Sequence, residues 1–379
     1  MNSGERMMRY LFAINTLNVG GAETGLVELI NELVAENEID LFLTYKTGPL
    51  LKKLDSRVNI ISMIDPEKTV SNIVGLVEFG LTIFGSSLGY RHCFNKDYDV
   101  EVSYLEGFPA LLISRSRKNS IKIASIRVEI KNHKTLLDRL PWGKKMQASM
   151  YNKFDGIHCV STATKNDFDE IFPASAQRSY VITTGFDIDK IHKRAILTNP
   201  FNHTNEKNLV LVGRMEDQKG YDKVFEAVSL LGELNEPYKI HIIGNKETKY
   251  AKKLITKYDE LLNKGLIVLH GQVSNPYPYI YYGDALISSS NYEGFPRVIN
   301  ESLALKKLVI ATDIPSNAEA LHNGVYGYQV TNDVEGIMKG IKLVVEEPDK
   351  LSFETHSVKT LTEFKDEFIN KISMIGGRI

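Results

Sequence analysis

The chain has 379 residues, of which 43% are hydrophobic and 25% charged, and its formal net charge is −1. This balance is typical of a globular protein, so it excludes a disordered or fibrous chain, and the length suits two domains. Cys93 and Cys159 are too few for a disulfide framework or a metal-ligand cluster, as is typical of the reducing cytosol. The N-terminus lacks the layout of a signal peptide, so we expect a cytoplasmic protein.

The first half of the chain alternates short apolar runs with stretches of helical periodicity. A helix over residues 22–36 follows the first predicted strand, with Leu26, Leu29, Ile30 and Leu33 on one face. Strands are predicted at residues 9–15, 40–45, 59–63, 100–104, 121–126, 156–160 and 180–183.

Residues 70–90 form the most apolar stretch, but they carry Glu78 and four glycines. A membrane-spanning helix needs about 20 mainly apolar residues, so this composition predicts a buried or surface-lying helix instead.

A second series of strands begins near residue 208, after a polar linker at 184–208. Its apolar runs lie at residues 209–213, 238–244, 266–271, 284–290 and 307–312, and each is followed by a turn and a helical stretch. This alternation is typical of an α/β fold with parallel sheets.

The pattern predicts two doubly wound, Rossmann-like domains that face each other across a central cleft. Their expected ranges are 1–190 and 191–355, and a helical segment at 356–379 is expected to pack back onto the first domain. Ligands of such sheets bind beyond the carboxyl ends of the strands.

The most informative motif joins a predicted strand to a helix that we expect to begin at Pro296. Glu293 lies in the connecting loop, and Glu301 lies about one and a half turns into the helix. The backbone amides of Gly294 and Phe295, with the helix dipole behind them, suit an anion or sugar hydroxyls. Taken singly, each glutamate is more simply interpreted as a solvated surface carboxylate.

Arg214 and Lys219 follow a strand that ends in Gly213. An arginine fork and a lysine point charge at the carboxyl end of a strand suit a nucleotide diphosphate, on which negative charge grows as a sugar departs. A structural origin explains such a pair equally well.

Gly20 and Gly21 stand between the first strand and the first helix, as in a phosphate-cradling loop. They match neither of the glycine patterns of dinucleotide and ATP sites, and a plain tight turn is the alternative. Asp187 and Asp189 spell D-x-D, which we interpret as a helix-capping turn. No other spacing argues for a metal, so we expect neither a metal nor a cofactor.

Residues 111–153 contain eleven lysines and arginines opposed by two acids, Glu129 and Asp138. Such a block is either a solvated face or a surface for anionic lipid or a phosphate-bearing acceptor.

Together, in this order and spacing, these motifs resemble the family 4 retaining glycosyltransferases, which have the two-domain GT-B architecture. The resemblance runs from Gly20 to Ala311, over most of the chain. Residues 103–112 and 122–133 resemble members that build bacterial surface polysaccharides, such as capsule, exopolysaccharide and O-antigen.

The resemblance implies roles for the residues near the second-half helix. Glu293 would touch the donor sugar, and Glu301 would bind the ribose of the nucleotide. The amides of Gly294 and Phe295, next to Pro296, would hold sugar hydroxyls or phosphate.

The resemblance also implies how the diphosphate is held. Arg214 and Lys219 would bind it and stabilise its charge as the leaving group, while Gly20 and Gly21 would close over it from the other domain. The reaction would retain the anomeric configuration without a required metal, by a front-face displacement.

The chain departs from the family pattern at one residue on the acceptor side. Arg127 stands where relatives often carry a histidine, and an arginine stays protonated and is a poor base, although it could hold a phosphate. Glu106, Glu129 and His133 complete the residues that we expect near the acceptor.

Three functions fit these observations. The leading one is a hexosyltransferase that moves a sugar from a UDP- or GDP-linked donor to a glycan or lipid-linked acceptor at the inner face of the plasma membrane. It would contact the membrane peripherally through residues 111–153 and bind no nucleic acid. The second is a non-catalytic nucleotide-sugar-binding subunit of a transferase complex, which the Arg127 departure favours. The third is a GT-B isomerase such as a nucleotide-sugar epimerase, which leaves the Gly20 loop unexplained.

Overall fold

The computed structural model describes residues 7–67, 80, 90, 94, 96–116, 119–132, 138, 142–201, 205–355 and 357–377. Its contacts divide the chain into two units, one made of Met1–Gly185 with Leu361–Ile379 and the other of Phe186–Thr360. The sequence-based boundaries at 190 and 355 each differ from these by five residues. The helix expected over residues 70–90 falls almost wholly outside the described residues.

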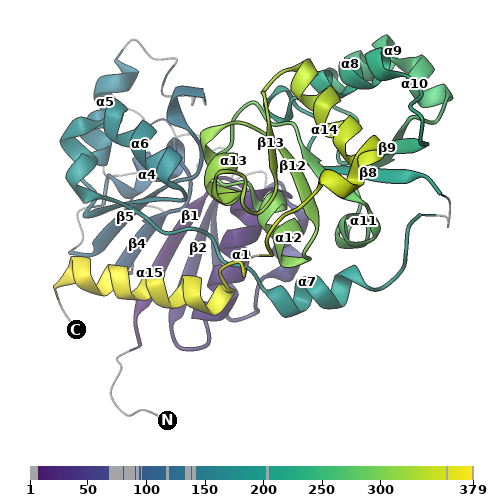
Figure 1. Cartoon of the computed structure of the whole chain (residues 1–379). Coiled ribbons are helices and arrows are strands. Elements are labelled where there is room, and N and C mark those ends of the chain that lie inside the picture. Colours follow the sequence, from purple (N-terminus) through teal and green to yellow (C-terminus); the bar gives the residue numbers. More distant parts are fainter. Residues whose placement is uncertain are drawn as a thin grey trace. The chain divides into compact units, whose positions relative to one another are not determined.

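The first unit is built on a seven-stranded parallel sheet with the order β3-β2-β1-β4-β5-β6-β7 (Figure 1). Helices cover both faces of the sheet, because apolar side chains point to both sides of its central strands. The strands are β1 (Arg9–Ile14), β2 (Glu38–Tyr45), β3 (Asn59–Ile64), β4 (Val100–Ser103), β5 (Ile121–Ile126), β6 (Gly156–Cys159) and β7 (Ser179–Val181).

The described helices of this unit form two layers. The core on one face includes residues of α1 and α15, and the core on the other includes residues of α4, α5 and α6. Their bounds are α1 (Gly21–Leu33), α4 (Phe108–Ile113), α5 (Gly143–Tyr151), α6 (Thr162–Ile171) and α15 (Leu361–Gly376), with the 3-10 turns η1 (Pro49–Lys53), η2 (Ile130–Asn132) and η4 (Pro173–Arg178).

The C-terminal helix α15 contributes to the core of the first unit, although the whole second unit precedes it in the chain. Phe364, Phe368 and Ile372 are buried at four-residue spacing, which places them on one helix face. The ring of Phe368 lies 6.4 Å from that of Phe12 in β1, and α15 contacts α1 and β5 (Figure 1).

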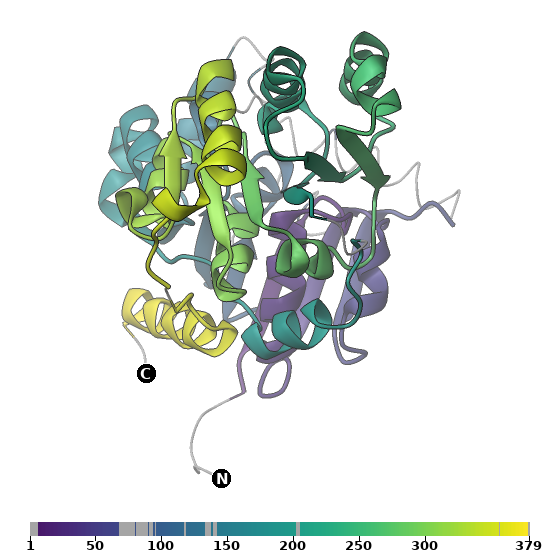
Figure 2. The same cartoon turned by 45° about the vertical axis from the view of Figure 1, so that its right-hand side comes forward.

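The second unit has a six-stranded parallel sheet with the order β10-β9-β8-β11-β12-β13. Helix α14 (Val334–Glu346), yellow-green in Figure 2, packs over this sheet beside α8 (Tyr221–Leu231). The strands are β8 (Lys207–Val212), β9 (Tyr238–Ile243), β10 (Ile267–Gly271), β11 (Ala285–Ser288), β12 (Leu308–Thr312) and β13 (Tyr328–Val330).

Two apolar clusters line the faces of this sheet and hold the remaining helices of the unit. Those helices are α7 (Ile188–Ala195), α9 (Lys249–Lys257), α10 (Asp259–Asn263), α11 (Tyr277–Tyr282), α12 (Arg297–Ala304) and α13 (Pro315–Ala320), with the 3-10 turns η5 (Asp217–Lys219), η6 (His322–Gly324) and η7 (Pro348–Lys350).

The predicted class of two doubly wound α/β domains is confirmed. The order of strands reverses once in each sheet, between β1 and β4 and between β8 and β11. Loops that leave two such strands diverge to opposite sides of the sheet, which opens a crevice at their carboxyl ends. Among the described helices, none is both long and apolar enough to cross a membrane.

Candidate functional site

The loop after β8 carries Lys219 to the reversal point of the second sheet. Lys219 ends the short turn η5, and Gly220 follows it with φ of 60° and ψ of 34°, in the left-handed region. A Cβ atom on Gly220 would lie 2.2 Å from the carbonyl oxygen of Ser289, so this position requires glycine. The hydroxyl of Ser289 donates to the carbonyl of Lys219 at 2.7 Å, and the loops after β8 and β11 are thereby held together.

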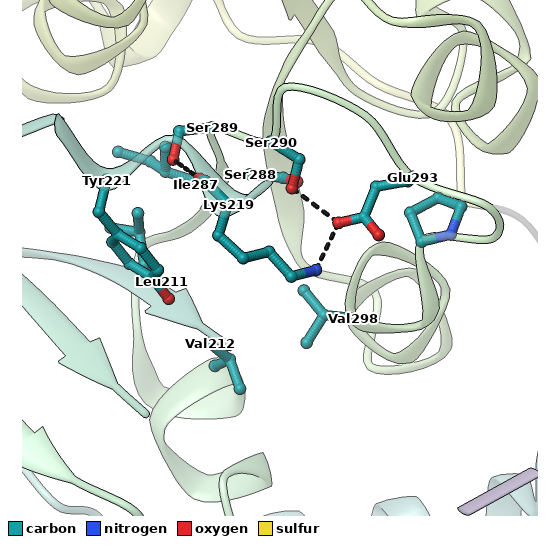
Figure 3. A pocket seen from close by; sticks show the side chains of 11 residues that line it. Leu211, Val212, Lys219, Tyr221, Ile287, Ser288, Ser289, Ser290, Glu293 and Val298 are labelled. Carbon is teal, nitrogen blue, oxygen red and sulfur yellow. Dashed lines mark hydrogen bonds and ion pairs between the residues drawn. The ribbon is translucent and has the colours of Figure 1, made fainter. Parts of the chain in front are cut away.

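Glu293 meets Lys219 where these loops join, and the two groups line one pocket (Figure 3). Its Oε1 atom accepts from Lys219 Nζ and from the hydroxyl of Ser290, the latter at 2.7 Å. Glu293 is only 7% exposed, so the ammonium and the hydroxyl offset the cost of removing a carboxylate from water. Valines 212 and 298 lie beside the pair and supply apolar walls.

Glu301 is also buried, at 8% exposure, on the fifth residue of α12. Its Oε1 lies 3.5 Å from Arg297 Nη2 and accepts from the Tyr277 hydroxyl at 3.4 Å. The simpler interpretation of Glu293 and Glu301 as solvated surface carboxylates is therefore wrong.

The start of α12 differs by one residue from the prediction. Arg297 is its first residue, and Pro296 is the N-cap with φ of −80° and ψ of 79°. Gly294 is buried, and the ring of Phe295 stacks on Phe186 with 6.2 Å between centroids. These contacts hold the loop between Glu293 and the helix.

Arg214 is placed differently from Lys219. Its side chain is 58% exposed and lies 3.5 Å from the carboxylate of Glu216. Among the described residues that line the pocket with Lys219 and Glu293, Arg214 is absent. The two cations predicted to act together thus follow the same strand, but only Lys219 contacts Glu293.

Gly20 and Gly21 lie at the reversal point of the first sheet, after β1. Gly20 is the N-cap of α1 and Gly21 its first residue, so the backbone amides of a helix start lie at this sheet edge. The φ of Gly20 is −158°, which is extended backbone, and the side chain of Glu23 fills the space where a Cβ atom would point.

Glu106 and Arg127 follow the adjacent strands β4 and β5. Oε1 of the buried Glu106 accepts from the backbone amides of Arg127 and Val128, the latter at 3.2 Å. The guanidinium of Arg127 lies 3.7 Å over the ring of Tyr104 and donates to Thr184 Oγ1 at 3.1 Å. Glu106 therefore fixes the loop that presents Arg127.

Glu129 is buried in the same loop and accepts from Asn132 Nδ2 at 2.6 Å. Lys131 lies 3.9 Å from its carboxylate. The structure thus places Glu106, Arg127 and Glu129 at neighbouring strand ends, while His133 lies outside the described residues.

The D-x-D motif is a helix cap, as predicted. Asp187 is the N-cap of α7, and its carboxylate accepts from the backbone amide of Lys190 at 3.0 Å. Within the described ranges, no group of three or more His, Cys, Asp or Glu side chains gathers as metal ligands would.

The basic residues of 111–153 that the structure describes do not form a single charged face. Arg127 is buried against Tyr104, and Lys131 lies 3.7 Å from Asp167. Lysines 144 and 145 are exposed on α5, next to Trp142, which is 56% exposed.

Sequence reasoning missed several residues that shape the site, among them Ser290, Tyr277 and Lys223. The three consecutive serines at the end of β11 gave a weak signal for the first of these. The contacts of Tyr277 and Lys223 could not be predicted from local spacing, because their partners are distant in sequence.

Two family models match this chain. Residues 19–190 match the model described as glycosyltransferase family 4, and residues 193–355 match the model described as glycosyl transferases group 1.

Relatives of the chain include two bacterial enzymes. It is 27% identical over 213 residues to the capsular polysaccharide biosynthesis glycosyltransferase CapH of Staphylococcus aureus. It is 28% identical over 204 residues to the N-acetylgalactosamine-N,N'-diacetylbacillosaminyl-diphospho-undecaprenol 4-alpha-N-acetylgalactosaminyltransferase of Campylobacter jejuni. Each match covers 53% of this chain and 56% or 53% of the relative, so the chain spans about half the length of the curated relatives it matches.

Among solved structures, Anabaena HepE in complex with UDP and glucose has a TM-score of 0.70 to this chain. The superposition covers 98% of this chain and 97% of HepE at 16% sequence identity, and it shows that the fold is shared.

Proposed function

We propose that this chain, both halves of which match glycosyltransferase models, is a glycosyltransferase of the GT-B class that transfers a sugar from a nucleotide-diphosphate sugar to a glycan or lipid-linked acceptor. The observation that carries this proposal is the contact of Lys219 with Glu293 at the reversal point of the second sheet. An ammonium and a carboxylate that share one pocket can bind a phosphate and a sugar hydroxyl, respectively.

In the proposed reaction the bond from the anomeric carbon to the diphosphate oxygen breaks, and the acceptor oxygen bonds to that carbon on the same face. The acceptor proton goes to the departing phosphate, and the anomeric configuration is retained. Lys219 offsets the negative charge that grows on the phosphate. Arg214 lies outside the pocket beside Glu216, and as a second cation its exposed side chain would turn from Glu216 to the phosphate. Glu293 orients the sugar, and Glu301 binds the ribose.

We assign the acceptor side to Arg127, Glu106 and Glu129. Arg127 is a fixed cation in a buried loop and suits a phosphate of a lipid-linked acceptor. The relatives support this class: one is a capsular polysaccharide enzyme, and the name of the other includes a diphospho-undecaprenol-linked sugar. We therefore place the protein in bacterial surface-polysaccharide synthesis, at the inner face of the plasma membrane.

The test is a screen of UDP- and GDP-linked sugars by thermal shift, because a ligand that binds the folded state raises its Tm. A donor that stabilises the protein is then incubated with acceptors in excess EDTA, and the anomeric configuration of the product is read by NMR. We expect turnover with retention. Failure of every nucleotide sugar to raise the Tm would contradict the proposal.

The accessory-subunit alternative is not favoured, because the relatives are named as glycosyltransferases and the chain has Arg214, Lys219, Glu293 and Glu301. If a donor binds but is neither transferred nor slowly hydrolysed, the accessory role would be favoured instead.

A further inference from the structure

Lys223 is a buried lysine between the loops that form the pocket. It lies in the first turn of α8 and is 7% exposed. Its ammonium donates to Asn291 Oδ1 at 2.6 Å and to Asn332 Oδ1. Burial lowers the pKa of Lys223, while the charges of Asp222, Asp333 and Asp217 act in the opposite direction.

These two bonds connect three segments that follow different strands. Lys223 lies beyond β8, Asn291 beyond β11 and Asn332 beyond β13. A Cβ atom on Gly220 would lie 2.9 Å from Lys223 Nζ, so the ammonium also packs against the turn that follows Lys219. Lys223 is thus in contact with both loops that carry the Lys219–Glu293 pair.

Asn291 uses every polar group of its side chain in this junction. Its Oδ1 accepts from Lys223, its Nδ2 donates to the carbonyl of Asp217 at 2.7 Å, and its backbone amide donates to the carbonyl of Gln218 at 2.8 Å. An ammonium can only donate, so it fixes which end of the amide faces it and directs Nδ2 toward Asp217. Glu293 lies two residues further along the same loop.

We propose that Lys223 is a positioning residue of the donor site, which orients Asn291 and thereby holds Glu293 opposite Lys219. The expected effect on kcat rests on the proposed function. Lys223 does not line the pocket itself, and it acts through the geometry of the two loops.

The test variant is Lys223→Met, which keeps the length of the side chain and removes its three donors. The change removes the cost of burying an ammonium but leaves the Oδ1 atoms of Asn291 and Asn332 without this donor, so we expect the Tm to change little. We expect kcat to fall about tenfold, which is about 1.4 kcal/mol, while the donor KM and the affinity for free UDP or GDP change little. The control is Lys253→Met, an exposed lysine on α9, which should behave as the wild type.

A second variant, Asn332→Ala, removes one acceptor and keeps the bond from Lys223 to Asn291. We expect a smaller loss of kcat than with Lys223→Met, and the double variant should match Lys223→Met alone, because both changes act on one group. Additive losses would contradict the mechanism.

Hydrogen exchange gives a readout that does not need turnover. In Lys223→Met the backbone amides of residues 217–220 and 289–293 should exchange faster than in the wild type, since the junction loosens. If the wild type is active and the variant has the same kcat and the same exchange rates, the role of Lys223 is overturned. If exchange becomes faster in the variant but the wild type itself turns over no donor, the positioning role stands and the proposed function is overturned.

Discussion

At the scale of single residues, the ammonium of Lys219 and the carboxylate of Glu293 compensate each other's charge. Each is largely covered, with side-chain exposures of 26% and 9%, so the loss of either leaves a charge without its compensation. In the proposed reaction the two groups separate in function, with Lys219 on the phosphate and Glu293 on the sugar.

We predict that Glu293→Gln and Lys219→Ala each reduce transfer by at least about a hundredfold, because each removes a charge at the reacting centre. Circular dichroism should show an intact fold in both. Glu335→Gln and Lys253→Ala, at exposed positions, are the matched controls. Near-normal transfer by either site variant would refute the site assignment.

His241 gives the second unit a dependence on pH. Burial, with His270 and Lys239 adding to it, lowers the pKa of His241 from 6.5 to about 4. The ring hydrogen-bonds to His270 and to Asn208 Oδ1, each at 2.9 Å. The folded state thus favours neutral His241, and the unfolded chain binds more protons between these two pKa values.

Stability should therefore be fully present above about pH 6.5 and fall as the pH drops toward about 4, by on the order of 3 kcal/mol. Thermal melts of the wild type and of His241→Gln across this range provide the measurement. We expect a flatter profile in the variant, and identical slopes would argue against His241 as the source.

Secondary-structure elements show how far the sequence alone can lead. Strand β5 lies at the predicted residues 121–126, and α1 buries the four predicted residues, although it ends at Leu33. Buried parallel strands leave continuous apolar runs, which are read easily. Strand β13 was not predicted, because Gln329 interrupts its three residues and leaves no continuous apolar run.

The site was predictable only where its residues follow strands in a recognisable pattern. Lys219 and Glu293 each follow a strand end, and both were predicted to lie in the site. Lys223 was missed because its partners Asn291 and Asn332 are 68 and 109 residues away, and spacing along the chain carries no sign of such contacts. The exposure of Arg214 could not be predicted either, because it depends on the conformation of the loop after β8.

Helix α5 is the element on which the proposed membrane contact can be tested. Lysines 144 and 145 are exposed there beside Trp142. Replacing both lysines with glutamine should weaken binding to anionic vesicles, since each contributes about 1 kcal/mol near such a surface. Sedimentation with vesicles at low and high salt is the measurement, and salt should weaken binding of the wild type. Glutamines at Lys252 and Lys253 of α9 serve as the control. Equal binding by the α5 variant would mean that this face is merely solvated.

At the scale of the whole molecule, the core of the first unit depends on helix α15, which follows the second unit in the chain. Deleting residues 361–379 removes Phe364, Phe368 and Ile372 from the core of the first unit. Loss of two buried phenylalanines and an isoleucine should cost more than about 5 kcal/mol, which is comparable to the stability of a whole domain.

We therefore predict that the truncated protein shows a native-like transition for the second unit and none for the first. Calorimetry and limited proteolysis would establish this, with Met374→Ala, at an exposed position of α15, as the control for changes in that helix. Retention of both transitions would contradict the role of α15.

The position of α15 also sets the order in which the protein can mature on the ribosome. Strands β1 to β7 emerge first, yet the apolar surface that α15 covers stays open until α15 has been translated. The second unit, whose residues are contiguous, can finish folding before the first. A nascent chain of this protein therefore exposes part of an apolar sheet face until α15 has been made, and its yield in the cell should depend on chaperones that shield that face.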